Sequence, residues 1–144
     1  MIRRATADDV EAIARLYEPS FATLDYLPVL HTLAEPRHWF ARRLAGHEGW
    51  VWDDDGVRGL MVLAENTLTY IYLDVGWTGR GIGTALLDHA KLRRPGGFTL
   101  WTFQQNKGAR RFHERHGLTA IEFGDGSGNE ERTPDIRYAW KSSA

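Results

Sequence analysis

A glycine-rich run, Gly76-Trp77-Thr78-Gly79-Arg80-Gly81-Ile82-Gly83-Thr84, joins an apolar stretch ending at Val75 to a helix-like pattern. Glycine lacks a Cβ atom, so the backbone N–H groups of such a run can approach a phosphate closely. The first turn of the following helix adds unpaired N–H donors and a partial positive charge. Arg80 could add an ion pair. The run therefore predicts an anion-binding loop.

The spacing of the glycines separates three kinds of phosphate-binding loop. A Walker loop requires Gly-Lys followed by Ser or Thr, and the sequence contains no such tripeptide. A dinucleotide loop of the form G-x-G-x-x-G would begin at Gly79 and would need glycine where Thr84 stands. The remaining pattern is Gln/Arg-x-x-Gly-x-Gly/Ala, which the residues from Thr78 to Gly83 approach.

A second group of side chains with acid–base chemistry lies between Asn106 and Gly117. Helical spacing places His113 and His116 on the inward face together with Ala109 and Phe112. Imidazole is a competent proton donor near neutral pH, so His113 is either a catalytic donor or a packed core histidine. We interpret His116 as structural. Two histidines at this spacing, without an assigned carboxylate partner, indicate metal only weakly, and we predict no metal site.

The elements that must position these residues alternate between strand and helix patterns. We expect an α/β (α+β) fold in which helices flank a mixed, mostly antiparallel sheet. One domain should cover residues 1–141, followed by a disordered tail at 142–144. The expected strands are residues 2–4, 50–52, 57–63, 68–75, 98–103, 119–123 and 136–140, and the expected helices are 6–19, one beginning at 32, 81–93 and 106–116.

Composition excludes several classes of function. The 144 residues carry 18 basic and 19 acidic side chains, so no strong field favours nucleic acid or an anionic membrane. The absence of cysteine rules out disulfides, thiolate metal sites and a cysteine nucleophile. No apolar run is long enough to cross a bilayer, and the polar first residues lead into no signal-peptide stretch. We expect a cytoplasmic protein without nucleic-acid or membrane partners.

The glycine pattern and the second motif together resemble the acyl-CoA signature of the GNAT superfamily of N-acetyltransferases. In the second motif, Asn106 is followed by Ala109, Phe112 and the pair Gly117-Leu118, where the family often has Gly-Phe. The opening Ile2-Arg3-Arg4-Ala5-Thr6 is similar to the family's first strand and the start of its first helix. The resemblance thus covers nearly the whole chain. It implies a sheet whose central strands are splayed around CoA, with acetyl-CoA as co-substrate.

The resemblance also implies which residues contact acetyl-CoA. Backbone groups of Leu73 and Val75 would bond the pantetheine arm, and Asn106 would bond it from the opposite side. Thr78 stands where the family prefers Gln or Arg, so we expect binding to be weakened there rather than lost. The backbone amides expected at the pyrophosphate belong to Gly79, Arg80, Gly81, Ile82, Gly83 and Thr84.

Proton transfer is less clearly assigned. Many relatives have a tyrosine that protonates the departing thiolate, and His113 occupies its position here. Some relatives carry a base on the central strand, where this chain has Thr67 and Thr69, neither of which can accept a proton. Glu65 and Asp74 are therefore the candidate bases, with an ordered water chain as the alternative.

Two further segments are candidates for the acceptor site. In the GNAT layout, the connection after the first helix and the loop between the last two strands flank the acceptor end of the cleft. Carboxylates at Glu130, Glu131 and Asp135 could attract a cationic amine, and Tyr26 or His31 could orient it. The alternative is a solvated charged loop with an incidental histidine.

The function predicted from the sequence is transfer of an acetyl group from acetyl-CoA to a primary amine. We expect this amine to belong to a small molecule. Direct attack in a ternary complex is expected, because the chain has no cysteine and the family implies it. A non-catalytic acyl-CoA-binding or interaction module with the same fold is the alternative, and acylation of protein amines is a third. A homodimer is compatible with the sequence, which does not decide it.

Overall fold

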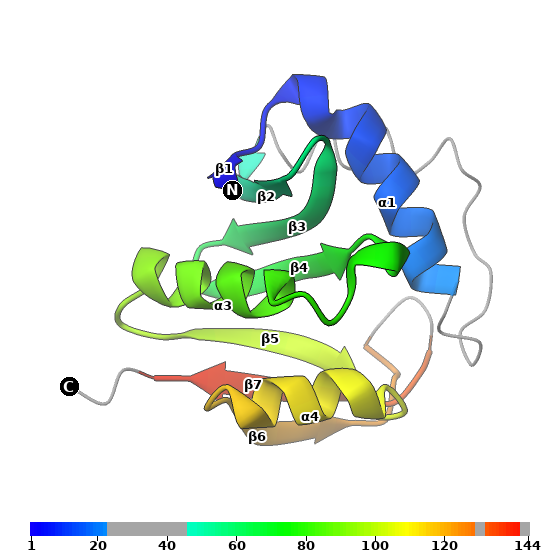
Figure 1. Cartoon of the computed structure of the whole chain (residues 1–144). Coiled ribbons are helices and arrows are strands. Elements are labelled where there is room, and N and C mark those ends of the chain that lie inside the picture. Colours follow the sequence, from blue (N-terminus) through cyan, green and yellow to red (C-terminus); the bar gives the residue numbers. More distant parts are fainter. Residues whose placement is uncertain (23–45, 129–131, 142–144) are drawn as a thin grey trace.

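The structure, a computed structural model, describes residues 1–22, 46–128 and 132–141 (Figure 1). Its strands are β1 (Ile2–Arg4), β2 (Glu48–Asp53), β3 (Val57–Ala64), β4 (Thr67–Leu73), β5 (Phe98–Phe103), β6 (Thr119–Gly124) and β7 (Asp135–Trp140). Its helices are α1 (Val10–Ala22), α3 (Ile82–Arg93) and α4 (Lys107–Arg115), with short 3-10 turns η1 (Ala7–Asp9) and η2 (Val75–Trp77).

The described strands form one seven-stranded sheet in the order β1-β2-β3-β4-β5-β7-β6. Every neighbouring pair is antiparallel except β4 and β5, which are parallel and are paired only at Thr67 and Thr99. One further bond continues this contact, from the amide of Thr99 to the carbonyl of Asn66 at 2.9 Å. Beyond this point the two central strands diverge, as the resemblance implied.

Helices cover both faces of the sheet. Ile13 of α1 packs with Val51, Leu60 and Val62 on one face. On the other face, α3 contributes Leu86, Leu87 and Ala90 to the larger core, and Phe112 of α4 packs against it. The helices α3 and α4 therefore lie on the same side, over the two halves of the sheet that β4 and β5 separate (Figure 1).

Local sequence explains most of the element boundaries. The turn from Asp53 to Gly56 has positive φ angles at Asp55 (54°) and Gly56 (124°), and Asp53 Oδ1 accepts from the amide of Gly56 at 3.2 Å. Thr6 and Asp9 form a capping box that starts the first helical segment. Arg3 holds this start against the hairpin, because its guanidinium bonds both Asp9 and Asp53.

The predicted fold class is confirmed, and most predicted boundaries agree within two residues. Two ends differ for a physical reason. The strand predicted to reach Val75 ends at Leu73, because the Asp74 carbonyl accepts from the Trp77 amide at 2.8 Å and closes η2. The first helix continues past Pro19 to Ala22, since an internal proline removes one hydrogen bond without always ending a helix. The helix predicted from residue 32 and the tail lie outside the described residues.

Within those same ranges, no helix is long and apolar enough to span a bilayer.

Candidate active site

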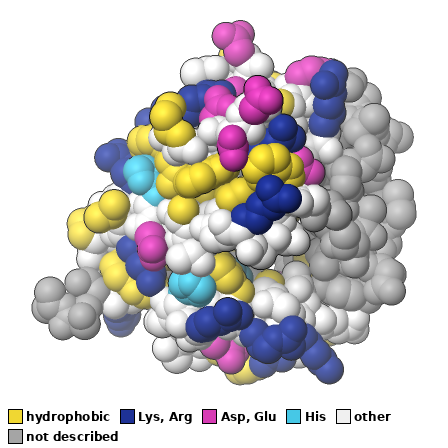
Figure 2. All heavy atoms as spheres, in the orientation of Figure 1, with side chains coloured by type: hydrophobic (Ala, Val, Ile, Leu, Met, Phe, Trp, Pro, Cys, Tyr) yellow, Lys and Arg dark blue, Asp and Glu magenta, His cyan; other side chains and the backbone are white. Residues whose placement is uncertain are grey.

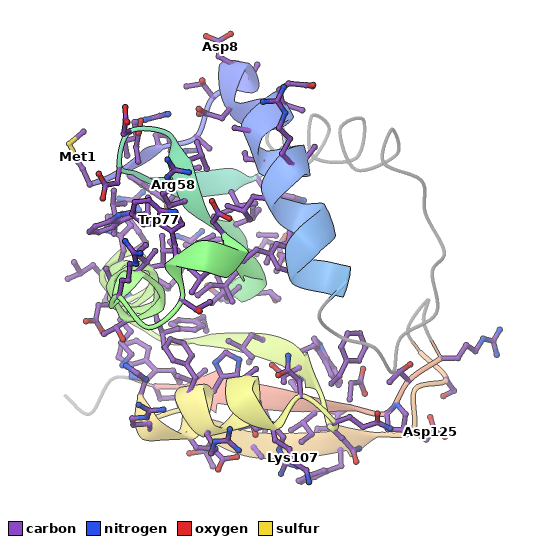
Figure 3. All side chains as sticks on the ribbon, turned by 45° about the vertical axis from the view of Figure 1, so that its right-hand side comes forward. Met1, Asp8, Arg58, Trp77, Lys107 and Asp125 are labelled. Carbon is purple, nitrogen blue, oxygen red and sulfur yellow. The ribbon has the colours of Figure 1, made fainter. Side chains whose placement is uncertain are left out.

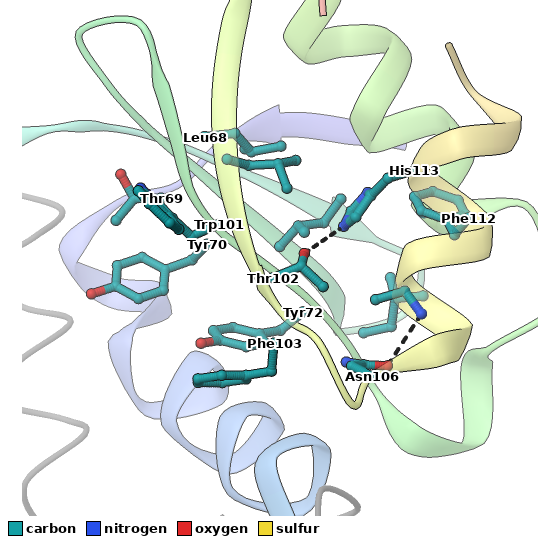
Figure 4. Close-up of a pocket in the computed structure, with 15 residues that line it drawn as sticks. Leu68, Thr69, Tyr70, Tyr72, Trp101, Thr102, Phe103, Asn106, Phe112 and His113 are labelled. Atoms are coloured by element: carbon teal, nitrogen blue, oxygen red, sulfur yellow. Dashed lines mark hydrogen bonds between the residues drawn. The ribbon is translucent and has the colours of Figure 1, made fainter. Parts of the chain in front are cut away.

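A cleft of about 260 Å³ occupies the space between the diverging strands β4 and β5 (Figure 4). The outer edge of β4 is bonded to β3, and that of β5 to β7. The two edges that face each other therefore present backbone N–H and C=O groups to an extended ligand. The cleft is lined by Leu68, Thr69, Tyr70, Ile71, Tyr72, Leu73, Gly83, Leu100, Trp101, Thr102, Phe103, Asn106, Ala109, Phe112 and His113.

The two sides of the cleft differ in chemistry. Tyr70, Tyr72, Trp101 and Phe103 lie on the side of the strands that faces away from α4 (Figure 4). The rings of Tyr70 and Tyr72 are 5.9 Å apart. The other side of the cleft is lined by the α4 residues and by Thr102. Strand alternation produces this division, because successive side chains point to opposite faces.

The glycine run forms an open turn that leads into α3. Gly79 and Gly81 have φ angles of 77° and 82°, a left-handed conformation that favours glycine, and a Cβ atom at either would meet nothing within 4 Å. The first backbone bond within α3 runs from Ala85 to the carbonyl of Gly81. The amides of Ile82, Gly83 and Thr84 thus precede the helical ladder and are the unpaired donors expected at a helix start.

The side chains of the glycine run differ in their burial and contacts. Ile82 is buried in the core, and Thr84 bonds His116 across to α4, so neither side chain is directed at a ligand. Arg80 is exposed and its guanidinium lies 4.5 Å from the centre of the Trp77 ring. Arg58 is equally close to this ring, and Figure 3 shows Arg58 beside Trp77. Thr78 is exposed at the end of η2.

Asn106 caps α4 and lines the cleft. Its Oδ1 accepts from the amide of Ala109 at 3.1 Å, and in the described part of the chain no partner is found for its NH2 group. Leu73 also lines the cleft, at the end of β4. Val75 follows in η2. Of the residues predicted for the pantetheine arm, Leu73 and Asn106 both line the cleft.

His113 is only 3% exposed and lines the cleft. Its Nε2 lies 3.0 Å from the hydroxyl of Thr102, and its Nδ1 is buried without a partner among the described residues. Burial and the charge of His116 lower the pKa of His113 to about 4, against an opposing effect of Glu114. The sequence left two roles open for His113, a protonated catalytic donor or a packed core histidine, and the lowered pKa favours the neutral imidazole near neutral pH.

His116 links the two helices on this face. Its Nδ1 lies 2.8 Å from the carbonyl of Phe112, so Nδ1 carries a proton, and its Nε2 lies 3.0 Å from the hydroxyl of Thr84. Both ring nitrogens are occupied, which agrees with a structural role.

Neither candidate base lies in the cleft. Glu65 precedes Thr67, where β4 and β5 are still paired, and it lines a different cavity beside Gly97 and Trp140. The carboxylate of Asp74 accepts from Arg58 at 3.3 Å, outside the lining. The assignment of these two residues as bases is therefore not supported by their positions. No carboxylate is present among the described residues that line the cleft.

A second cavity of about 560 Å³ adjoins the cleft and shares Trp101, Thr102 and Phe103 with it. Asp135 lines this cavity as predicted, together with Glu122 and Asp125. Of the other acceptor residues predicted, Tyr26, His31, Glu130 and Glu131 lie outside the described residues. Over the described residues, no group of three possible metal ligands occurs.

Sequence reasoning missed several residues of the site. Gln104 links two residues that line the second cavity, because its side-chain NH2 donates to the carbonyls of Gly124 (2.9 Å) and Asp135 (3.0 Å). Thr102 was not singled out, although it follows from strand alternation that it faces α4. Tyr70 and Tyr72 alternate on β4 in the same way, and that pattern was the available signal.

The sheet is thus parted between its central strands, and a glycine turn and a helix start lie beside the gap. The chain belongs to the GNAT acetyltransferase family, since the family model for the acetyltransferase (GNAT) domain matches residues 37–119. A comparison with curated protein sequences finds no match.

Solved structures with the same fold cover nearly the whole chain. The apo form of YjaB from Escherichia coli has 23% identity and a TM-score of 0.79, over 99% of this chain and 98% of that one. A putative phosphinothricin N-acetyltransferase has 22% identity and a TM-score of 0.76, over 100% and 99%. The ribosomal-protein-S18-alanine N-acetyltransferase from Escherichia coli has 16% identity and a TM-score of 0.75, over 100% and 95%.

Proposed function

We propose that this protein transfers the acetyl group of acetyl-CoA to a primary amine of a small molecule, by direct attack of the amine in a ternary complex. The observation that carries the proposal is the separation of β4 from β5 beyond the single pair Thr67 and Thr99, next to the start of α3. Gly83 belongs to both features, because it lies in the first turn of α3 and lines the cleft.

The diphosphate end of acetyl-CoA fits the glycine turn. The amides from Gly79 to Thr84 supply donors, and the start of α3 supplies a partial positive charge. Arg80 is the nearest cation in sequence, held over Trp77. Figure 2 shows Lys and Arg side chains gathered over α4, which carries Lys107, Arg110, Arg111 and Arg115. A surface of this sign raises the local concentration of an anionic ligand.

The pantetheine arm fits the cleft itself. Its amide groups would bond the inner edges of β4 and β5 as an added strand does, with Leu73 on one side and Asn106 on the other. This arrangement brings the thioester toward Thr102 and His113.

Direct attack is supported by what lines the cleft. The chain has no cysteine, and the described lining residues include no lysine or carboxylate, so a covalent intermediate would need one of the side chains of Thr69, Tyr70, Tyr72, Thr102 and His113. A positioned amine is then the simplest nucleophile, and holding it next to the thioester supplies much of the rate enhancement.

The second cavity is the proposed place of the acceptor. Its carboxylates at Glu122, Asp125 and Asp135 suit an amine that carries positive charge, and Trp101, which is 47% exposed, offers an aromatic face. Glu130, Glu131, Tyr26 and His31 remain proposed acceptor contacts, as do a homodimer and a cytoplasmic location.

Thiol release from acetyl-CoA tests the proposal, with spermidine, lysine, kanamycin and short peptides as acceptors. We expect turnover with at least one small amine and CoA binding by calorimetry. Binding of CoA without turnover would favour a non-catalytic module, and turnover with peptides alone would contradict the small-molecule assignment. Burst kinetics in the absence of acceptor, with an acetylated protein that then reacts with amine, would contradict direct attack.

A further inference from the structure

Acetyl transfer to an amine must move one proton from nitrogen to sulfur. The attacking nitrogen gains a positive charge as it bonds the carbonyl carbon, and the departing thiolate needs a proton or a hydrogen bond. The cleft offers few groups for this task. Of its described lining residues, only Tyr70, Tyr72 and His113 have titratable side chains.

The two tyrosines and the histidine stand on opposite sides of the cleft (Figure 4). Tyr70 and Tyr72 lie on the side facing α1, where they pack against the core cluster that contains Ile13. Neither tyrosine lies on the side of the cleft where Thr102 and His113 meet (Figure 4). His113 is the group whose protonation can change in both directions during a reaction.

Thr102 stands between His113 and the cleft. Its hydroxyl is 3.0 Å from Nε2 of His113, and this is the contact marked in Figure 4. Thr102 is 9% exposed and lines both the cleft and the second cavity. A hydroxyl can donate one hydrogen bond and accept others at the same time, so it can pass a proton on.

The surroundings of His113 keep the imidazole in its neutral form. Phe112 and Tyr138 place their ring centres 5.6 Å and 5.5 Å from it. Among the described residues, the charged or titratable groups near it are Tyr138, His116, Glu114 and Arg110; Glu114 accepts from the Tyr138 hydroxyl at 2.7 Å, and Arg110 donates to that hydroxyl at 3.4 Å. Glu114 and Arg110 therefore bond to Tyr138, and no carboxylate bonds to His113 in the part of the chain described.

We propose that His113 is a proton shuttle for both halves of the reaction: through the hydroxyl of Thr102, it accepts the proton released by the attacking nitrogen and returns it to the departing sulfur. This inference rests on the proposed function. Thr102 is then the catalytic residue that meets the reacting atoms, and His113 acts through it.

The steps balance as follows. The nitrogen–carbon bond forms, the nitrogen gives its proton to Oγ1 of Thr102, and the hydroxyl proton passes to Nε2 of His113. When the carbon–sulfur bond breaks, Nε2 returns its proton to Oγ1, and the hydroxyl proton passes to the thiolate. The enzyme ends in its starting state, and neither a carboxylate base nor a second acid is required.

Three variants test the shuttle, with acetyl-CoA as donor and the fastest amine of the panel above as acceptor. His113→Gln should lower kcat by about 10²- to 10⁴-fold, the usual contribution of a positioned acid or base, with the Michaelis constant for acetyl-CoA unchanged. Thr102→Val should cause a similar loss, whereas Thr102→Ser should keep most of the activity. The double variant should be no slower than His113→Gln alone, because the two residues act as one unit.

The matched control is His89→Gln. His89 is a partly buried histidine of α3 that packs on Trp50, and its Nε2 also lacks a partner in the described structure. This variant should keep the wild-type kcat. Circular dichroism and CoA calorimetry on every variant show whether it is folded and binds the donor.

The pH profile separates a shuttle from a protonated acid. A shuttle must begin neutral, so the wild-type kcat/KM should rise with the deprotonation of the acceptor and then stay level. A protonated donor would make the rate fall as pH rises through its pKa. A falling limb that disappears in His113→Gln would overturn the inference, and so would full activity of folded His113→Gln or Thr102→Val. Absence of turnover in the wild type with every acceptor overturns the proposed function itself.

Discussion

A Cβ atom at Gly83 of α3 would lie 3.3 Å from Cζ of Phe112 on α4. This contact is closer than most Cβ contacts in proteins, so the absence of a side chain at Gly83 lets the two helices meet over the gap between β4 and β5. Phe112 lines the cleft, and its position sets the width of the cleft on this side. In the proposed function, Gly83 would thus contribute to CoA binding through its packing as well as through its amide.

Gly83→Ala should weaken CoA binding by pushing Phe112 toward the cleft. Alanine favours a helix over glycine by up to about 1 kcal/mol, but overpacking costs about 1–3 kcal/mol, so we expect a small net loss of stability. Calorimetry with CoA and thermal unfolding measure both effects. Gly108→Ala on α4 is the control, because its nearest contact, Asn106 Oδ1, is at 3.9 Å and it should be neutral or stabilising. Tighter CoA binding by Gly83→Ala would contradict the packing argument.

Arg80→Gln should raise the dissociation constant of CoA about two- to fivefold, because an exposed ion pair contributes at most about 1 kcal/mol. The difference from wild type should shrink at high salt, where screening removes it. Trp77→Leu should act in the same direction, since the ring no longer holds the guanidinium 4.5 Å away. Arg15→Gln on α1 changes the net charge equally and should have no effect. A loss that is independent of salt would argue against an ion pair with phosphate.

Acid should destabilise the fold in part through Glu48. Burial opposes ionisation of Glu48, but hydrogen bonds from Arg93, Trp50 and Arg94 outweigh it and lower its pKa from 4.5 to about 2. Because the folded pKa is the lower one, the stabilisation is present above the unfolded pKa of 4.5 and is lost as pH falls toward 2.

The Glu48 contribution amounts to about 1–2 kcal/mol, since solvent screens the half-exposed Arg93. Urea unfolding across this pH range should show a weaker pH dependence for Glu48→Gln than for wild type. Asp88→Asn, at an exposed position of α3, serves as the control and should follow the wild-type curve. Parallel curves for Glu48→Gln and wild type would contradict the assignment.

The fold was predictable because its signals are local. The glycine spacing, the strand from Phe98 to Phe103 and the helix that starts near Asn106 depend on neighbouring residues, and the structure has each of them. The environment of His113 was not predictable in this way. Its neutral state depends on burial, and its contact with Thr102 of β5 exists only once the strand and helix are packed.

The position of Glu65 relative to the cleft was also not predictable from the sequence. Proximity to the predicted strand made it a candidate base, but the direction in which two parallel strands diverge is a tertiary property. Because pairing occurs at Thr67, Glu65 lies at the closed end, whereas Leu73 lies where the strands are apart. No pattern in the sequence distinguishes these two ends.

Asp135→Asn should raise the Michaelis constant of a cationic acceptor roughly tenfold, because one charge-assisted contact is lost. The Michaelis constant of acetyl-CoA should not change. A Cβ at Gly124 would overlap Oδ1 of Asp135, so this carboxylate lies against the backbone at the wall of the second cavity. Gln104 bonds the Asp135 carbonyl, so the substitution leaves the position of the chain intact. Steady-state kinetics with both substrates varied measure the effect, and Asp54→Asn in the β2–β3 turn is the control. If both Michaelis constants rose together, the second cavity would not be a separate acceptor site, because a group that contacts the acceptor alone cannot weaken the donor equally.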